Sequence, residues 1–233
     1  ASDSLIIGRD ALGLEPLYFG KSESLFAFAT ERKALWKLGL SKVEPFPPGN
    51  IAAVEDNARF AFRHVRTVEQ PALKQPDMGS AARHLQTLLA QSTKDRIFGI
   101  EEVAIAFSGG LDSSLVAFLA QRYNDKVRLI NVGLENMPET KHAEDAAEAL
   151  NLPIQVKAFS VDDVEATLHK ILWLIETSNA ADASIAIPLY WAAELAAKRG
   201  LKVLLTGQGA DESCGGYHRY MHSYAERGAK FLQ

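Results

Sequence analysis

The sequence is poor in cysteine and in long apolar runs. Its single cysteine, Cys214, excludes an internal disulfide, which fits a reducing compartment, and we expect this side chain to pack as a small buried hydrophobe. No uninterrupted apolar span is long enough to cross a bilayer, and the opening residues ASDSLIIGRD lack a charged leader followed by an apolar stretch. We therefore predict a cytoplasmic protein that does not associate with membranes.

Basic charge is also scarce. The chain has 25 Lys and Arg residues against 29 Asp and Glu residues, a net charge of -4, and the basic residues are scattered rather than clustered. This distribution lacks the electrostatic footprint of a nucleic-acid-binding protein, so we expect no nucleic-acid partner. With 47% hydrophobic and 23% charged residues, the composition is that of an ordinary globular protein of one large or two modest domains.

The first region, residues 1–76, carries short β-rich segments separated by Gly, Pro, Asn and Asp. These segments predict an antiparallel sheet: SLIIG, LYFG, SLFAFAT, NIAAVE and ARFAFRHV. A helix is predicted over 30–39, with Thr30 as its N-cap and Gly39 just past its end. The polar, proline-bearing stretch EQPALKQPDMGS that follows is suited to a linker.

In the second region, residues 77–233, helices and strands alternate. We predict helices over 80–96, 113–123 and 140–150, a helix that begins at Ser160 and one that Pro188 opens and Gly200 closes, with strands over 102–107, 126–134, 153–159 and 202–206. Leu115, Phe118 and Leu119 are the expected apolar stripe of the second helix. Strands separated by helices pair in parallel, so we predict an α/β fold with a doubly wound sheet and a ligand site at the carboxyl ends of its strands.

The loop after Phe107 has the composition of an anion-binding loop. In EEVAIAFSGGLDSSLVAF, Gly109 and Gly110 allow a tight turn with exposed backbone N–H groups, and the serines add hydroxyl donors. The helix that follows directs its positive end at the same place. Asp112 would repel a phosphate unless a divalent cation lay between them, so the pattern favours a polyphosphate bound with Mg²⁺ over a simple N-cap turn.

SGGLDSS resembles the pyrophosphate loop of the N-type ATP pyrophosphatases (the PP-loop, adenine nucleotide alpha hydrolase-like fold) and, within them, the asparagine synthetase branch. The resemblance implies a carbon–nitrogen ligase that uses ATP and Mg²⁺. A carboxylate, aspartate by default, attacks the α-phosphorus, pyrophosphate leaves into the loop, and the acyl adenylate then reacts with ammonia or glutamine-derived ammonia. Ser108, Gly109, Gly110, Asp112, Ser113 and Ser114 match the loop, while Ala106 and Val132 match positions whose backbone faces adenine.

A second stretch, LLTGQGADESCGGYHRY, is similar to the family segment SGEGSDE followed by GGY. By that match Thr206 and Gly207 lie along the nucleotide, and Asp211 pairs with Asp112 as the second magnesium carboxylate. Gln208 stands where the family commonly has a glutamate, and an amide cannot act as a base near neutral pH. Asn179 likewise replaces a family aspartate. These departures keep two alternatives open: a related synthetase, β-lactam synthetase-like, with another carboxylate, and a non-catalytic nucleotide-binding or assembly subunit.

The first 76 residues also resemble a known family. GRDALGLEPLYFG, FAFATERKALWKLGL and VEPFPPGNIAAVE are similar to the closing part of the class II glutamine amidotransferase (Ntn) domain. That domain's nucleophile is an N-terminal cysteine, whereas this sequence starts at Ala1, so we expect no glutamine hydrolysis by this chain alone. We also expect the helical C-terminal part of the synthetase domain to be absent. We further expect the chain to form a homo-oligomer or to associate with the missing amidotransferase half.

Overall fold

The computed structural model describes residues 5–23, 25–54, 60–69, 77–135 and 138–217. The chain divides into two compact units, Ala1–Gln75 and Pro76–Gln233, which are considered separately below. No helix within the described ranges is both long enough and apolar enough to span a membrane.

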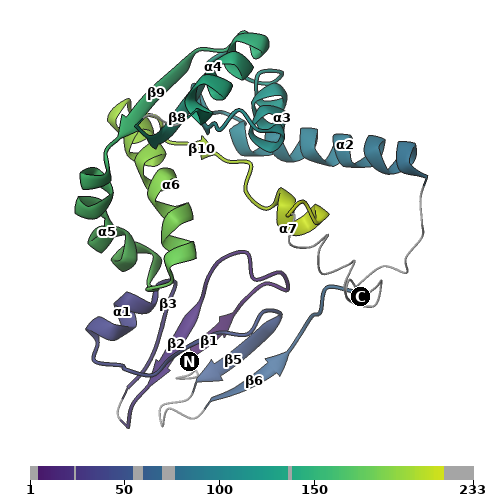
Figure 1. Ribbon diagram of the computed structural model, residues 1–233. Coiled ribbons are helices and arrows are strands. Elements are labelled where there is room, and N and C mark those ends of the chain that lie inside the picture. Colours follow the sequence, from purple (N-terminus) through teal and green to yellow (C-terminus); the bar gives the residue numbers. More distant parts are fainter. Residues whose placement is uncertain (1–4, 24, 55–59, 70–76, 136–137, 218–233) are drawn as a thin grey trace, which may run out of the picture. The chain divides into compact units, whose positions relative to one another are not determined.

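The described residues of unit 1 form two antiparallel three-stranded sheets and one short helix (Figure 1). The sheet orders are β1-β5-β6 and β3-β2-β4. The elements are β1 (Leu5–Gly8), β2 (Tyr18–Lys21), β3 (Phe26–Ala29), α1 (Arg32–Lys37), β4 (Val43–Pro45), β5 (Asn50–Val54) and β6 (Phe60–His64). The predicted antiparallel pairing is therefore confirmed. Its assignment to an amidotransferase domain stays a prediction.

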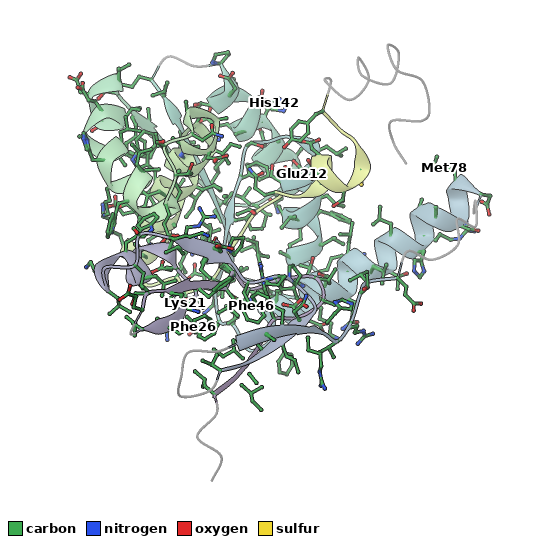
Figure 2. The ribbon with its side chains drawn as sticks, turned by 90° about the horizontal axis from the view of Figure 1, so that it is seen from below. Lys21, Phe26, Phe46, Met78, His142 and Glu212 are labelled. Carbon is green, nitrogen blue, oxygen red and sulfur yellow. The ribbon has the colours of Figure 1, made fainter. Side chains whose placement is uncertain are left out.

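Aromatic rings form the core of unit 1. Phe46 is fully buried, and the Phe62 ring meets it edge-on with 5.0 Å between centroids. Phe19 stacks on Phe26 at 6.0 Å, and Figure 2 shows Phe26 and Phe46 among the strands of this unit. Edge-to-face and offset contacts of this kind are favourable because the positive edge of one ring meets the negative face of another.

Helix α1 begins later than the sequence predicts. Its N-cap is Glu31, which has an extended backbone and no capping side-chain hydrogen bond, so the assignment of Thr30 as the cap is wrong. The end of the helix agrees with the prediction: Gly39 follows the C-cap at a φ of +82°, a left-handed conformation that glycine adopts without steric cost.

Unit 2 is built around a four-stranded, all-parallel sheet with the order β10-β7-β8-β9 (Figure 1). Its elements are α2 (Met78–Ile97), β7 (Val103–Ala106), α3 (Leu111–Ala120), β8 (Val127–Leu134), α4 (Glu139–Leu150), β9 (Ile154–Phe159), α5 (Val161–Ile175), α6 (Ala180–Lys198), β10 (Leu204–Leu205) and α7 (Ala210–Cys214). The chain winds from β7 outward to β9 and then crosses back to β10 on the other side of β7. The predicted doubly wound α/β sheet is confirmed, with its switch point between β7 and β10.

Helices cover both faces of this sheet. One hydrophobic cluster joins Val103, Ile105 and Leu129 to Ala117 of α3 and Ala143 of α4, all less than 2% exposed. On the other face, Ala104 and Ile130 pack against Ala192 and Ala196 of α6. Successive side chains along a strand point to opposite faces of the sheet, so each strand contributes to both hydrophobic clusters. This is the pattern of a parallel sheet that helices cover on both faces.

Two helices depart from their predicted starts. Helix α2 begins inside the supposed linker, because the Asp77 side chain caps it by accepting from Ser80 N at 3.0 Å. Helix α6 begins at Ala180, where Asn179 accepts from Ala181 N at 2.9 Å, so Pro188 lies inside the helix rather than at its start. The predicted start of α5 at Ser160 agrees with the structure to within one residue: the helix begins at Val161, and Ser160 is its N-cap in a complete capping box with Asp163.

One prediction about packing is partly wrong and another is wrong. Of the predicted stripe of α3, Leu119 is buried, but Leu115 and Phe118 are 39% and 45% exposed, and Ser113, Ala117 and Ala120 complete the buried face. Ala117 and Ala120 belong to the hydrophobic cluster that contains the strand residues Val103, Ile105 and Leu129. Cys214 is exposed rather than buried, since the short helix α7 buries none of its residues.

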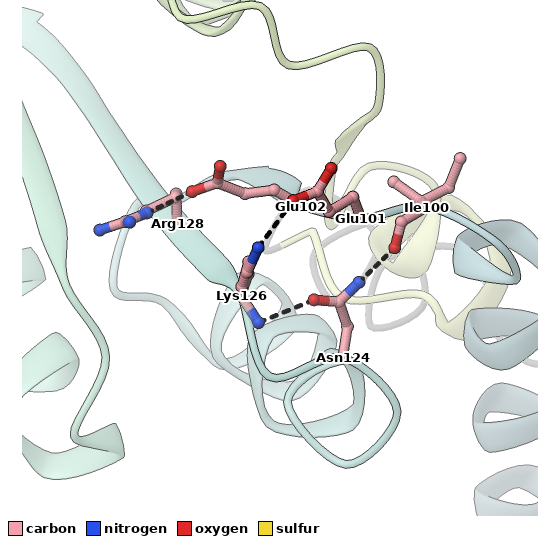
Figure 3. A network of polar contacts seen from close by, with 6 residues as sticks. All are labelled: Ile100, Glu101, Glu102, Asn124, Lys126 and Arg128. Atoms are coloured by element: carbon pink, nitrogen blue, oxygen red, sulfur yellow. Dashed lines mark hydrogen bonds and ion pairs between the residues drawn. The ribbon is translucent and has the colours of Figure 1, made fainter.

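A polar network joins the segments that precede β7 and β8 (Figure 3). Lys126 Nζ lies 2.7 Å from Glu101 Oε1, and Arg128 Nε lies 2.5 Å from Glu102 Oε1. Asn124 donates from Nδ2 to the Ile100 carbonyl and accepts from Lys126 N, both at 2.8 Å. These contacts link the amino ends of the two central strands.

Candidate nucleotide site

The loop Ser108–Gly110 connects β7 to α3 and is organised by two serine hydroxyls. Ser113 Oγ accepts from Ser108 N at 3.3 Å and donates to the Gly110 carbonyl at 3.2 Å. The Ser108 and Ser113 hydroxyls lie 3.1 Å apart, and Gly110 N donates to Ser108 Oγ at 3.2 Å. The first turn of α3 is therefore hydrogen-bonded to the loop, and these bonds hold the loop backbone in one conformation.

Gly109 is required by a close approach of α4. Its φ is +79°, and a Cβ at this position would lie 2.8 Å from Ala143 Cα and 3.0 Å from the His142 carbonyl oxygen. Both obstacles are backbone atoms of α4, which cannot rotate away. Glycine is therefore needed here for two reasons: the backbone conformation is left-handed, and a side chain would overlap the backbone of α4.

The amino terminus of α3 begins at a glycine N-cap, Gly110. No side chain in the described residues caps it. Helix N-termini normally satisfy their first N–H groups with an Asn, Asp, Ser or Thr side chain, with water or with a bound anion. An uncapped N-terminus at the switch point of a parallel sheet is a suitable place for phosphate oxygens.

The loop after β10 closes against that same helix turn. A Cβ on Gly207 would lie 2.9 Å from Ser113 N and 3.0 Å from Asp112 Cβ. The missing side chain therefore allows the segment Thr206–Gly209 to reach the start of α3. Helix α7 follows, with Asp211 and Glu212 in its first turn.

These loops line an open cavity of about 510 Å³. Nine of the predicted site residues line it: Ala106, Ser108, Asp112, Ser113, Val132, Thr206, Gly207, Gln208 and Asp211. Gly109, Gly110 and Ser114 are not among the lining residues. Gly109 packs on α4, Gly110 caps α3, and Ser114 Oγ donates to the Gly109 carbonyl at 3.3 Å, so these three residues shape the loop rather than the cavity wall.

Several wall residues carry no local sequence motif. Glu139 comes from the start of α4, and Ser184 and Pro188 come from α6. Proline has no N–H, so the Ser184 carbonyl, four residues earlier, lacks its α-helical donor at the cavity wall. Glu212 also lines the cavity and accepts from Tyr217 Oη at 2.6 Å; Figure 2 labels it on α7.

The two predicted metal carboxylates line the same cavity although 98 residues separate them, since Asp112 follows β7 and Asp211 follows β10. The Asp211 carboxylate lies against Gly216, where an added Cβ would fall 1.9 Å from Oδ1. In the described ranges, no group of three or more Asp, Glu, His or Cys side chains is arranged to hold a metal. Two carboxylates fit Mg²⁺ when phosphate oxygens and water complete its coordination, which is how this ion is commonly bound.

The fold and the cavity define a doubly wound α/β domain with a glycine-rich loop at its topological switch point. The chain belongs to the asparagine synthase family, because the family model described as "Asparagine synthase" matches residues 84–232. It is 35% identical over 242 residues to the putative asparagine synthetase [glutamine-hydrolyzing] 1 of Methanocaldococcus jannaschii, covering 97% of this chain and 44% of that protein. It is 28% identical to asparagine synthetase B [glutamine-hydrolyzing] of Escherichia coli, covering 94% of this chain and 42% of that protein. The chain therefore spans less than half the length of these relatives.

Solved structures with a similar arrangement include two NAD synthetases. The NH3-dependent NAD synthetase from Campylobacter jejuni aligns with a TM-score of 0.41 at 17% identity, covering 58% of this chain and 60% of that one. The glutamine-dependent NAD+ synthetase from Acinetobacter baumannii, in complex with ADP, aligns with a TM-score of 0.44 at 17% identity, covering 84% of this chain and 35% of that one.

Proposed function

We propose that this chain carries the carboxylate-activating part of an ATP-dependent amide ligase of the asparagine synthetase type. Aspartate is the acceptor that family membership favours, and ammonia is the nitrogen donor unless a glutaminase is supplied. The observation that carries the proposal is the placement of Asp112 and Asp211, from loops on the two sides of the switch point, around one cavity at the uncapped start of α3.

The polar lining of the cavity can receive the triphosphate of ATP at the first turn of α3, where no side chain of the described residues caps the backbone N–H groups. The apolar lining, which includes Ala106, Val132 and Ala192, offers a surface for adenine. In this arrangement the N–H groups at the start of α3 would stabilise the charge that develops on departing pyrophosphate.

Asp112 and Asp211 are the residues that would hold Mg²⁺ in this arrangement. The ion, when bound, neutralises phosphate charge and so lowers the barrier to attack by the acceptor carboxylate. Asp112 lies in the first turn of α3, where the helix dipole stabilises its negative charge. Gly216 leaves room for the Asp211 carboxylate, and Gly215 and Gly216 both donate their N–H groups to the Asp211 carbonyl, at 2.9 and 3.1 Å.

Asn179 does not argue against aspartate as the acceptor. Its side chain caps α6 by accepting from Ala181 N, which is a hydrogen bond that an aspartate makes equally well. The exchange of one residue for the other therefore preserves the local structure. Gln208 is a stronger departure, because it lines the cavity and cannot accept a proton from the incoming nitrogen.

The test is exchange of labelled pyrophosphate into ATP, which reports acyl-adenylate formation and does not require the amidation step. We expect aspartate-dependent exchange by the complete protein. Asp112→Ala and Asp211→Ala should each lower the rate by at least about a hundredfold, because each removes an anchor of the metal and of the developing charge. Asp125→Ala, an exposed aspartate at the opposite edge of the sheet, is the matched control and should leave the rate unchanged. Exchange at wild-type rates in both cavity variants would refute the assignment.

Gln208 favours a second candidate, a non-catalytic subunit that binds nucleotide. Calorimetry separates the two functions. Binding of Mg·ATP that is lost in Asp112→Ala, with no AMP formed from any of a panel of carboxylates, would support the non-catalytic subunit. Gln208→Glu offers a further comparison: if the amide only weakens catalysis, the variant should accelerate amide formation while leaving pyrophosphate exchange unchanged.

A further inference from the structure

A second open cavity adjoins the nucleotide cavity at the carboxyl end of β8. It has a volume of about 560 Å³ and lies among the end of β8, the start of α4 and the helices α5 and α6 (Figure 1). Five residues line both cavities: Asn131, Val132, Glu139, Ser184 and Pro188. The two cavities therefore adjoin along a shared set of residues from three elements, β8, α4 and α6.

The second cavity, called the apolar cavity below, has mostly hydrophobic walls. The larger side chains that line it but not the nucleotide cavity are Leu134, Val164, Leu168, Ile187 and Trp191. The Trp191 ring stacks on Phe159 with 3.8 Å between centroids, and its Nε1 donates to Thr167 Oγ1 at 3.4 Å. Because its polar atom already has a partner in α5, Trp191 offers the cavity an apolar ring. A Cβ added to Gly133, which also lines the cavity, would meet no heavy atom within 4 Å.

The described residues that line the two cavities include no Lys, Arg or His. They include four carboxylates: Asp112, Glu139, Asp211 and Glu212. An additional carboxylate moved from water to an apolar wall without a positive partner is strongly disfavoured. An apolar group gains about fourfold in affinity for each methylene that it buries. The apolar cavity therefore suits an uncharged, apolar group rather than a second carboxylate.

We propose that the apolar cavity receives the body of the acceptor, so that the ligase activates apolar monocarboxylic acids in addition to the aspartate that family membership favours. This inference rests on the proposed function and names a substrate class for it. The carboxylate of the acid lies in the nucleotide cavity, where one of its oxygens forms a bond to the α-phosphorus of ATP. The bond from that phosphorus to the oxygen that bridges to the β-phosphorus breaks, and pyrophosphate leaves with the bonding electron pair. The apolar body of the acyl adenylate stays in the apolar cavity.

Succinate and 4-methylpentanoate are matched probes, because the second has an isopropyl group where the first has a carboxylate of similar shape. In pyrophosphate exchange by the complete protein, kcat/KM should be at least about tenfold higher with 4-methylpentanoate than with succinate. Equal values, or a lower value with 4-methylpentanoate, would overturn the inference. Exchange with aspartate but not with 4-methylpentanoate would overturn this inference and leave the proposed function intact. Exchange with neither acid would overturn both.

Two neighbouring alanines in the first turn of α6 locate the body of the acid. Ala180 and Ala181 are both exposed, but Ala180 lines the apolar cavity whereas Ala181 lines neither cavity. Ala180→Phe puts a ring at the cavity wall and should lower kcat/KM for 4-methylpentanoate at least about tenfold, with Mg·ATP affinity unchanged in calorimetry. Ala181→Phe is the matched control and should leave both quantities unchanged. A loss of the same size in both variants, or in neither, would overturn the placement of the acid in this cavity.

Discussion

The two edges of unit 2's parallel sheet are built from different residues. At the amino ends of β7 and β8, Glu101 and Glu102 form ion pairs with Lys126 and Arg128 (Figure 3). At the carboxyl ends, Asp112 and Asp211 line one cavity together with serines, glycines and apolar side chains such as Val132 and Leu189. The amino edge thus pairs its charges internally, whereas the carboxyl edge keeps carboxylates in a cavity wall where a ligand can reach them.

An asparagine stands at each edge and shows the same contrast. Asn131 is 6% exposed and donates from Nδ2 to the Phe107 carbonyl at 2.8 Å, directly before the Ser108–Gly110 loop. Asn124 is less buried and donates to the Ile100 carbonyl at the same distance. In both cases the hydrogen-bonded residues are 24 positions apart in the sequence, so the side chain links the ends of two neighbouring strands. The carboxyl edge is therefore held by a few buried contacts whose loss should affect ligand binding and stability together.

The largest expected effect comes from Gly109→Ala. The variant must place an alanine at a φ of +79° and also overlap backbone atoms of α4, so we expect a loss of about 3 kcal/mol or more in the free energy of unfolding. Gly99→Ala is the matched control, because Gly99 has a φ of +73° but no atom within 4 Å of an added Cβ. It should cost about 1 kcal/mol from backbone strain alone. Denaturant unfolding measures both, and equal losses would show that the close approach to α4 has no energetic weight.

Replacement of the two asparagines should have intermediate effects. Asn131→Ala leaves a buried carbonyl without its donor and should cost about 2 kcal/mol, with weaker Mg·ATP binding because the loop that begins at Ser108 loses its support. Asn124→Ala should cost about 1 kcal/mol, since water can reach the freed carbonyl, and should leave nucleotide affinity unchanged. Titration calorimetry measures the Mg·ATP affinity of each variant, and chemical unfolding measures its free energy of unfolding. Equal loss of nucleotide affinity in both variants would contradict the functional division between the edges.

Much of the carboxyl edge could be predicted from the sequence because its signals are local. The glycines and serines of SGGLDSS directly follow an apolar strand, and a parallel sheet brings strand ends together, so Asp112 and Asp211 were expected near one another. Family membership and the doubly wound sheet are confirmed. The roles of the individual site residues stay predictions.

What the sequence could not indicate depends on packing between distant elements. Ser184 and Glu139 line the cavity because α6 and α4 cross the strand ends, and neither lies in a local motif. The usual preference of proline predicts a helix start at Pro188, but Asn179 caps the helix nine residues earlier and the packing of α6 on the sheet outweighs the lost hydrogen bond. The buried face of α3 could be predicted only in part: Leu119 is buried as expected, but Ala117 and Ala120 rather than Leu115 and Phe118 complete that face.

The smallest expected effect lies at the amino edge, in Glu101→Gln. A hydrogen bond from Lys126, and then its charge, lower the pKa of Glu101 below its ordinary value of 4.5. A lowered pKa in the folded state means that the pair stabilises the protein above pH 4.5 and that this contribution is lost as the pH falls through the folded-state pKa. Both side chains are exposed, so the contribution is small and screened by salt. We expect Glu101→Gln to unfold slightly more easily at pH 7 and to match the wild type at strongly acidic pH, with unchanged pyrophosphate exchange. A loss of exchange activity in this variant would show that the charge of Glu101 affects the nucleotide cavity. That result would contradict the functional division between the two edges of the sheet.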